Sequence, residues 1–220
     1  MIVDERFSTY VASLEAPEEP LLERIEAEAL AARVPIIRKE TQSFLKTLLV
    51  MHKPRKVLEI GTAVGFSALL MSAYLPEGGH ITTIENYEKR IPIARENFRQ
   101  AGKEGEISLI QGDALAVMKE LTEAYDLIFM DAAKGQYIHY LPEAVRLLAP
   151  GGVLVSDNVL QGGDVLESRF AVERREPDQS TAGCGSISSE LKHHESAADL
   201  HPASGRRGGV KREEELTSDR

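Results

Sequence analysis

The chain of 220 residues has only one cysteine, Cys184, so it can form neither an internal disulfide nor a multi-thiolate zinc site. No stretch approaches the ~20 consecutive apolar residues that span a bilayer. The first residues also lack the basic and then apolar segments of a secretory signal. We therefore predict a cytoplasmic protein with no membrane partner, whose fold depends on packing alone.

Positive charge is not in excess either. The chain has 26 Lys and Arg against 35 Asp and Glu, which gives a net charge of −9. A uniformly basic surface for nucleic acid is thereby excluded, whereas a local basic patch is not. Six basic residues between positions 33 and 56 form such a patch or lie on a solvated helical face, namely Arg33, Arg38, Lys39, Lys53, Arg55 and Lys56.

Large apolar residues become scarce after residue 170. All twelve Tyr and Phe lie at or before Phe170. The last 50 residues hold too few aliphatic side chains to offset the ~1–2 kcal/mol of backbone entropy that each ordered residue loses. We predict a helical cap at residues 1–55, a core at 56–170 and an atypical tail at 171–220, either disordered or read in a shifted frame.

Hydrophobic periodicity predicts the fold class of the remainder. Residues 18–33 and 41–52 carry apolar stripes at helical spacing. Beyond Lys56, five short apolar runs, at 57–60, 81–84, 107–110, 125–130 and 153–155, alternate with helix candidates near 65–75, 87–101, 114–122 and 136–148. This alternation predicts an α/β fold with a mostly parallel sheet and helices on both faces.

Polar and glycine residues follow the first three runs, where ligands gather in a sheet of this kind. Gly61 and Gly65 form a turn between a strand and a helix, a shape that admits a ligand close to the main chain. Glu85 ends the second run and is suited to accept hydrogen bonds from ribose hydroxyls. Asp113, after the third run, either faces an adenine amino group or caps a helix. Together the three segments favour a nucleoside cofactor, although each has an ordinary structural explanation as well.

Two nucleoside cofactors fit this pattern unequally. The dinucleotide motif G-x-G-x-x-G requires glycine where this chain has Ala63, which disfavours NAD and an NAD-dependent oxidoreductase. The spacing from Glu59 through Gly61 to Gly65, with acids at the next two strand ends, resembles the S-adenosylmethionine (SAM) site of Rossmann-like class I methyltransferases. Ser67 and Ala114 belong to the same segments and complete the predicted cofactor site.

Acidic and amide side chains also follow the fourth and fifth runs. Asp131, Asp157 and Asn158 would meet if these two strands are neighbours. A set made only of oxygen donors suits a hard cation, which is Mg²⁺ by default, with Mn²⁺ or Ca²⁺ as alternatives. A helix-capping acid and an Asx turn are the structural explanations for the same residues. Lys134, three residues after Asp131, is a candidate base for a substrate hydroxyl or an ordinary surface lysine.

The segments around Asp131, Lys134, Asp157 and Asn158, joined to the glycine turn, resemble the metal-dependent O-methyltransferases of catechol and caffeoyl-CoA. The likeness covers about residues 20–165, and residues 34–36, 134–137 and 157–160 are most similar to bacterial tRNA 5-hydroxyuridine methyltransferases. The resemblance implies that Asp131, Asp157 and Asn158 bind Mg²⁺, that Asp131 also contacts SAM, and that Asp131 and Lys134 are catalytic.

The resemblance also implies substrates and partners. We expect methyl transfer to a hydroxyl, with the wobble 5-hydroxyuridine of a tRNA anticodon as the main prediction. A small catechol-like or caffeoyl-CoA-like molecule is the alternative, and an inactive SAM-binding protein is a further one. Relatives usually pair, so a homodimer is expected.

The tail of the written sequence lacks the two strands with which this family normally ends. Residues 200–210, read one base later with suitable codons, encode a peptide that resembles the missing final hairpin. We therefore hypothesise a frameshift in the gene or in its record. An intact mass equal to that of the written chain would refute it.

Overall fold

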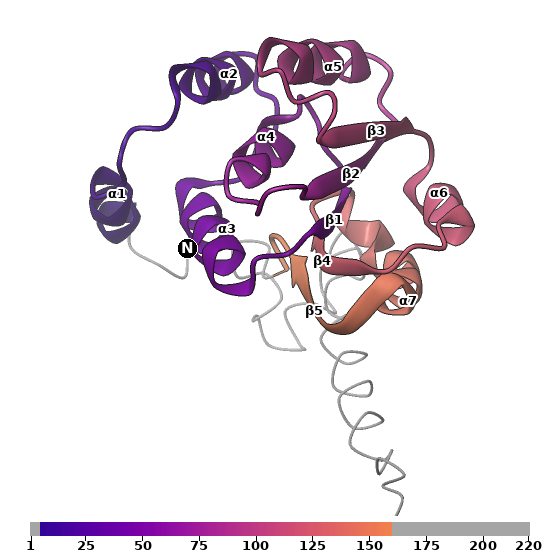
Figure 1. Ribbon diagram of the computed structural model, residues 1–220. Coiled ribbons are helices and arrows are strands. Elements are labelled where there is room, and N and C mark those ends of the chain that lie inside the picture. Colours follow the sequence, from indigo (N-terminus) through magenta and orange to yellow (C-terminus); the bar gives the residue numbers. More distant parts are fainter. Residues whose placement is uncertain (1–4, 160–220) are drawn as a thin grey trace, which may run out of the picture.

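The computed structural model describes residues 5–159 (Figure 1). The predicted tail at 171–220, and with it the frameshift hypothesis, lies outside these described residues. Five strands form one sheet in the order β3-β2-β1-β4-β5, and every neighbouring pair is parallel. The strands are β1 (Lys56–Ile60), β2 (His80–Glu85), β3 (Ile107–Gln111), β4 (Tyr125–Met130) and β5 (Leu148–Ser156). The predicted fold class is thus confirmed.

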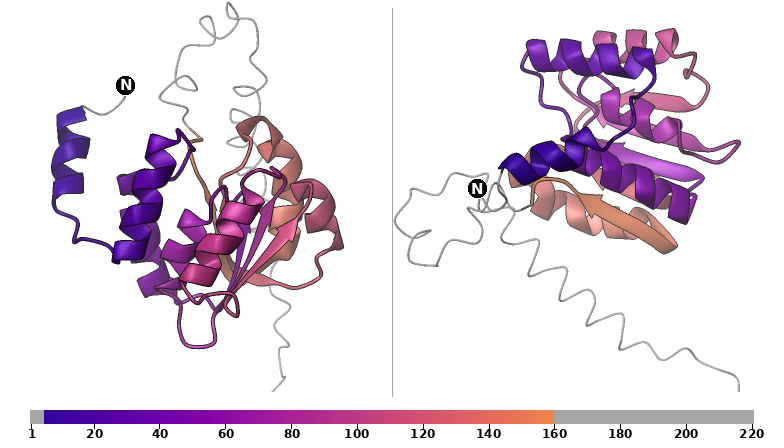
Figure 2. Two further views of the ribbon diagram at one scale, coloured as in Figure 1. Left: turned by 90° about the horizontal axis from the view of Figure 1, so that it is seen from above. Right: turned by 90° about the vertical axis from the view of Figure 1, so that its left-hand side faces the viewer.

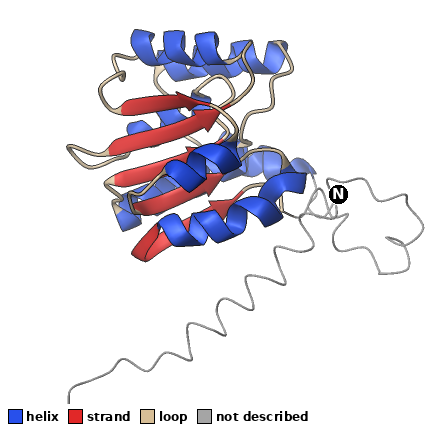
Figure 3. Ribbon diagram, turned by 90° about the vertical axis from the view of Figure 1, so that its right-hand side faces the viewer, coloured by secondary structure: helices blue, strands red, loops and turns tan. Residues whose placement is uncertain are grey.

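Helices connect the strands and cover the sheet on both sides (Figure 3). Those in the described part of the chain are α1 (Glu5–Ser13), α2 (Pro20–Ala31), α3 (Lys39–His52), α4 (Phe66–Ser72), α5 (Ile91–Gln100), α6 (Ala114–Glu120) and α7 (Tyr137–Leu147), with a short 3-10 helix at Lys134–Gln136. None of them is long and apolar enough to cross a membrane.

The alternation of side chains along β1 divides the core into two layers. Val57 packs with α2, α3, α4 and α5, whereas Leu58 and Ile60 pack with α6 and α7. Successive strand residues point to opposite faces, so a central strand that is covered on both sides is apolar at nearly every position. Glu59 is the exception in β1, since its fully buried carboxyl faces the α4 side.

The N-terminal helices belong to the first of these layers. Leu22 and Ile25 of α2 and Leu45 and Leu49 of α3 are buried in the same cluster as the side chains of α4. Figure 2 shows α1 standing apart from the sheet, where it contacts α3. The sequence indicated a helical region here but did not delimit α1.

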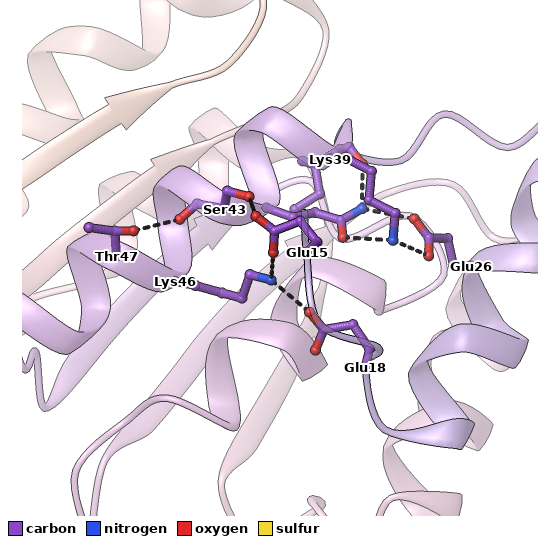
Figure 4. A network of polar contacts seen from close by, with 9 residues as sticks. Glu15, Glu18, Glu26, Lys39, Ser43, Lys46 and Thr47 are labelled. Carbon is purple, nitrogen blue, oxygen red and sulfur yellow. Dashed lines mark hydrogen bonds and ion pairs between the residues drawn. The ribbon is translucent and has the colours of Figure 1, made fainter. Parts of the chain in front are cut away.

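A polar network holds the segment before α2 against α3 (Figure 4). Lys46 Nζ lies 2.5 Å from Glu15 Oε2 and 2.8 Å from Glu18 Oε1. Ser43 donates a hydrogen bond to Glu15, whose pKa is lowered by its hydrogen bonds to Lys46 and Ser43. Burial acts to lower the pKa of Lys46, but the two carboxylates outweigh it and raise that pKa.

The fifth strand is longer than its sequence suggested. The apolar run predicts a strand at 153–155, whereas β5 begins at Leu148. Pro150, Gly151 and Gly152 interrupt the apolar pattern, and the register with β4 shifts between Leu148 and Val153. Proline has no N–H to donate and glycine weakens strands, so this half of β5 carries no strand signal.

Candidate active site

A cavity of about 450 Å³ opens at the carboxyl ends of the strands. The chain reverses its direction of strand addition between β1 and β4, and crevices form at such a switch point. The segments that line the cavity are Pro35–Ile37, Gly61–Ala63, Phe66 and Ser67, Ile84–Tyr87, Arg90, Gly112, Ala114, Asp131–Ala133 and Asn158. Residues from six loops or helix starts therefore share one pocket.

The turn after β1 follows a path that requires glycine at two positions. Gly61 has a φ of +92°, and a Cβ added there would lie 2.5 Å from the carbonyl oxygen of Asp131. Gly65 has a φ of +85°, and its added Cβ would lie 2.5 Å from the Phe98 ring. Gly61 lines the cavity, whereas Gly65 serves close packing against α5. The predicted contact of Gly65 with a cofactor stays a prediction.

Glu85 is held in place by three backbone N–H groups. Its Oε1 accepts from Asn86 at 3.0 Å and from Tyr87 at 2.9 Å, and its Oε2 accepts from Ala63 at 2.8 Å. A carboxylate has about four acceptor positions, so this arrangement leaves one, on Oε2, for a further donor. The side chain is 8% exposed and lines the cavity, as expected for an acid that receives a ribose hydroxyl.

The ends of β4 and β5 bring the predicted metal ligands to one place. Met130 and Ser156 are register partners, and the Asp157 N–H donates to the Met130 carbonyl at 3.0 Å. Asp157 Oδ1 accepts from Thr41 at 3.3 Å, and its Oδ2 accepts from the Asn158 amide at 2.8 Å. Asp131 and Asn158 line the cavity, whereas Asp157 is not among the described lining residues; Asp131 and Asp157 each directly follow one of the register partners Met130 and Ser156.

Comparison with known proteins identifies this architecture. Residues 12–179 match the family described as O-methyltransferase. The chain belongs to the O-methyltransferase family. It is 31% identical over 169 residues to a catechol O-methyltransferase of Niastella koreensis, covering 74% of this chain and 76% of that protein. It is 35% identical over 152 residues to a catechol O-methyltransferase of Mycobacterium tuberculosis, covering 68% of this chain and 69% of that one.

Solved structures agree with the sequence relatives. An O-methyltransferase from Bacillus cereus in complex with SAH has a TM-score of 0.76 and 28% identity, with 86% of each chain covered. The O-methyltransferase TomG of Streptomyces achromogenes, in complex with SAM, has a TM-score of 0.76 and 27% identity, with 88% of each chain covered. This protein is therefore a SAM-dependent O-methyltransferase of the catechol and caffeoyl-CoA type, and the NAD alternative is set aside.

In this O-methyltransferase, Glu59 is the most deeply buried of the predicted cofactor residues. Ser67 Oγ donates to Glu59 Oε1 and Thr83 Oγ1 donates to Oε2, both at 2.5 Å. Burial raises the pKa of the Glu59 carboxyl to about 7, although these hydroxyls act to lower it. The buried Thr62 Oγ1 forms no hydrogen bond among the described residues. Ser67 and Thr62 line the cavity, whereas Glu59 does not.

Of the other residues predicted for the site, some line the cavity and some do not. Ala114 lines it, but Asp113 does not, because Asp113 caps α6 by accepting from the Ala116 N–H at 3.0 Å. The helix-capping alternative for Asp113 is therefore what the structure contains, and contact with adenine stays a prediction. Lys134 begins the 3-10 helix, but its side chain lies outside the described part of the structure, so its role as a base also stays a prediction.

The predicted basic patch does not assemble as one surface at the cavity. Lys53, Arg55 and Lys56 precede β1, at the end of the sheet opposite the cavity. Lys56 pairs with Glu123 at 2.6 Å, and Lys39 pairs with Glu26 at 2.7 Å. Lys56 and Lys39 thus form ion pairs on different elements, whereas Arg33, Arg38 and Lys39 flank the segment Pro35–Ile37 that lines the cavity.

Two groups of residues that line the cavity were not predicted from the sequence. Pro35, Ile36 and Ile37 supply an apolar wall from the segment before α3. Arg90 lies with its guanidinium 5.0 Å from the centre of the Tyr87 ring, and both line the cavity beside Glu85. Tyr87 and Arg90 follow directly after a strand end, and that position was the available signal for them.

Proposed function

We propose that this protein transfers the methyl group of SAM to one hydroxyl of a small catechol-like molecule, with a divalent cation bound at the ends of β4 and β5. The observation that carries the proposal is the shared cavity. The anchored Glu85 carboxylate and the oxygen donors of Asp131 and Asn158 line the same space, so cofactor and acceptor would meet there. Catechol O-methyltransferases among the relatives support the choice of substrate class.

The donor set fits a hard cation. Among residues 5–159 no group of three or more His, Cys, Asp and Glu is arranged to hold a metal ion, so any site here depends on an amide oxygen as well. Asn158 can supply this oxygen. Its amide nitrogen donates a hydrogen bond to Asp157, so its Oδ1 is the atom that would bind the cation. Asp131, Asp157 and Asn158 would therefore hold Mg²⁺, or Mn²⁺ or Ca²⁺, with waters completing the shell. A cation there lowers the pKa of a hydroxyl that binds to it.

The residues of the chain would orient the cofactor and the acceptor molecule and would provide a proton acceptor. Glu85 holds the ribose end, the turn at Gly61 admits the amino-acid end against the main chain, and Pro35–Ile37 exclude water from the acceptor side. Holding two reactants in line in this way contributes up to ~7–11 kcal/mol in intramolecular reactions. Lys134 follows the Asp131 loop; as a neutral amine it would accept the hydroxyl proton, and as an ammonium it would stabilise the resulting oxygen anion.

A catechol is favoured because its two adjacent hydroxyl oxygens chelate one cation, which orients a single hydroxyl toward the methyl group. Caffeoyl-CoA carries the same pair of hydroxyls, and caffeoyl-CoA O-methyltransferases are among the relatives. The tRNA wobble 5-hydroxyuridine remains the second candidate, because Pro35 and Ile36, which carry the resemblance to the tRNA enzymes, line the cavity. The dispersed basic residues make it the less favoured substrate.

A direct assay separates these substrates. Purified protein is incubated with SAM carrying a labelled methyl group and with catechol, caffeoyl-CoA or tRNA containing 5-hydroxyuridine, each with Mg²⁺ or with EDTA. We expect the highest kcat/KM on a diol, and loss of transfer in EDTA that added Mg²⁺ restores. Efficient transfer to tRNA alone, or activity unaffected by EDTA, would overturn the proposal. The absence of turnover together with SAM binding would support the inactive-protein alternative.

We also propose a homodimer, as the resemblance implied. Light scattering of the purified chain should give about twice its mass of 24.2 kDa. A mass of one chain at micromolar concentration would contradict this.

A further inference from the structure

Glu59 occupies an unusual place for a residue of a cofactor site. It is 0% exposed in β1, the central strand of the sheet, and it is absent from the described residues that line the cavity. A buried carboxyl destabilises the folded protein unless its oxygens accept or share hydrogen bonds. What it touches therefore indicates what it does.

Two hydroxyl groups satisfy the carboxyl, and each comes from a different element. Thr83 of β2 is the register partner of Glu59, so the pairing of the two central strands brings the Thr83 hydroxyl to Oε2. Ser67, in the first turn of α4, donates to Oε1. Glu59 thus connects the middle of the sheet to the start of the helix that follows the glycine turn.

Of these two residues, Ser67 lines the cavity and Thr83 does not; Thr62 lines it too, but its hydroxyl forms no hydrogen bond with any described residue. Ser67 is 7% exposed, and a serine hydroxyl rotates among three staggered positions unless a partner selects one. The Glu59 oxygen is such a partner. A ligand that contacts the Ser67 hydroxyl therefore meets a group whose direction is already fixed, which lowers the entropy lost on binding.

We propose that Glu59 is a positioning residue, which fixes the Ser67 hydroxyl at the wall of the cofactor cavity and does not itself contact the cofactor. The inference rests on the proposed function, in which the cofactor's amino-acid end lies against the turn at Gly61. It changes the role of Glu59 from that expected of the sequence motif. An acceptor oxygen is what this role requires, and a negative charge is not.

Variants of Glu59 and Ser67 can separate a need for an acceptor oxygen from a need for a negative charge. Glu59→Gln keeps the shape and one acceptor oxygen, whereas Glu59→Leu removes both acceptors at similar volume. Ser67→Ala removes the hydroxyl that Glu59 orients. Ser72→Ala is the matched control, because Ser72 is a buried serine on the same helix whose hydroxyl bonds to the Leu69 carbonyl away from the cavity.

Calorimetric titration with SAH measures the outcome. We expect Ser67→Ala and Glu59→Leu each to weaken SAH binding by about tenfold, the size of one lost hydrogen bond. The double variant should bind about as well as either single variant rather than a hundredfold worse than wild type, since Glu59 acts only through Ser67. Glu59→Gln should stay within about threefold of wild type and Ser72→Ala should match it.

Additive losses in the double variant would overturn the inference, because Glu59 would then contact the ligand independently. A loss beyond about tenfold in Glu59→Gln would do the same, since a charge would then be required. If thermal unfolding shows that Glu59→Leu does not fold, the Glu59→Gln result decides alone. A wild-type protein that binds no SAH overturns this inference and the proposed function together, whereas additivity in a protein that binds SAH overturns the inference only.

Discussion

The Glu85 carboxylate accepts a hydrogen bond of 2.8 Å from the backbone N–H of Ala63. These residues lie 22 positions apart, at the ends of neighbouring strands. Ala63 has a φ of +48°, in the left-handed region that non-glycine residues seldom adopt, and it lies in the turn that presents its N–H to Glu85. Glu85, the acid proposed to bind the ribose, is therefore connected directly to the glycine turn.

Replacing Glu85 by Gln should impair cofactor binding and stability together. The amide has only one acceptor oxygen for three N–H donors, so at least one donor is left without a partner, at about 1–3 kcal/mol. We expect SAH affinity to fall by at least about tenfold. Calorimetry and urea denaturation measure the two effects. Glu88→Gln, an exposed acid three residues away, is the control and should change neither; equal losses in both variants would contradict the role of Glu85.

Gly61 should tolerate no side chain. Gly61→Ala places a Cβ 2.5 Å from the Asp131 carbonyl oxygen, so the turn or the end of β4 must move. Gly78 has a similar positive φ of +74° but open space around it, which makes Gly78→Ala the matched control for backbone strain. We expect about 1 kcal/mol of destabilisation in the control and several in Gly61→Ala, measured by urea denaturation. Equal values for the two variants would show that the close approach to Asp131 is unimportant.

Glu59 should make the folded protein less stable as the pH rises. Because burial raises its folded pKa to about 7 from an ordinary value of 4.5, the folded chain holds this proton more tightly than the unfolded chain. The stabilisation is complete below about pH 4.5 and is lost as the pH passes 7. Between pH 5 and pH 8, the free energy of unfolding of wild type should fall by up to about 3 kcal/mol relative to Glu59→Gln. Parallel curves for the two proteins would refute the raised pKa.

Lys46 should contribute more to stability than an exposed ion pair does. It meets both Glu15 and Glu18 in partly buried surroundings, with 15% of its side chain exposed. Lys46→Met leaves two carboxylates facing each other without a cation, and we expect a loss of about 1–2 kcal/mol. Arg99→Ala, which breaks the exposed pair with Glu96, should cost less than about 0.5 kcal/mol. Similar losses for the two variants in thermal unfolding would contradict this.

Strand ends were the features that the sequence predicted best. Parallel strands in one sheet bring their carboxyl ends to one edge, so Glu85, Asp131 and Asn158 could be placed together from apolar runs alone. The wall formed by Pro35–Ile37 could not, because it lies there through the packing of α2 and α3 on α4. The first half of β5 was missed because proline and glycine there interrupt the apolar pattern.

The hydrogen bonds between side chains and their partners could not be predicted from the sequence, because they depend on the register of the strands. Glu85 is anchored in part by the backbone N–H of Ala63, and an alanine gives no sign in the sequence of either this contact or its left-handed conformation. The role of Glu59 depends on which hydroxyls strand pairing and the start of α4 bring within reach. Both require the register of β1 and β2, which periodicity leaves open.

The central claim is that Asp131, Asp157 and Asn158 hold a divalent cation beside the cofactor. A crystal structure of the full chain grown with Mg²⁺ and SAH tests it most directly. We predict SAH in the cavity with its ribose on Glu85, and a cation coordinated by oxygens of all three residues. Bound SAH with no cation at these oxygens, or with Asp131 turned away from Asp157, would contradict the account.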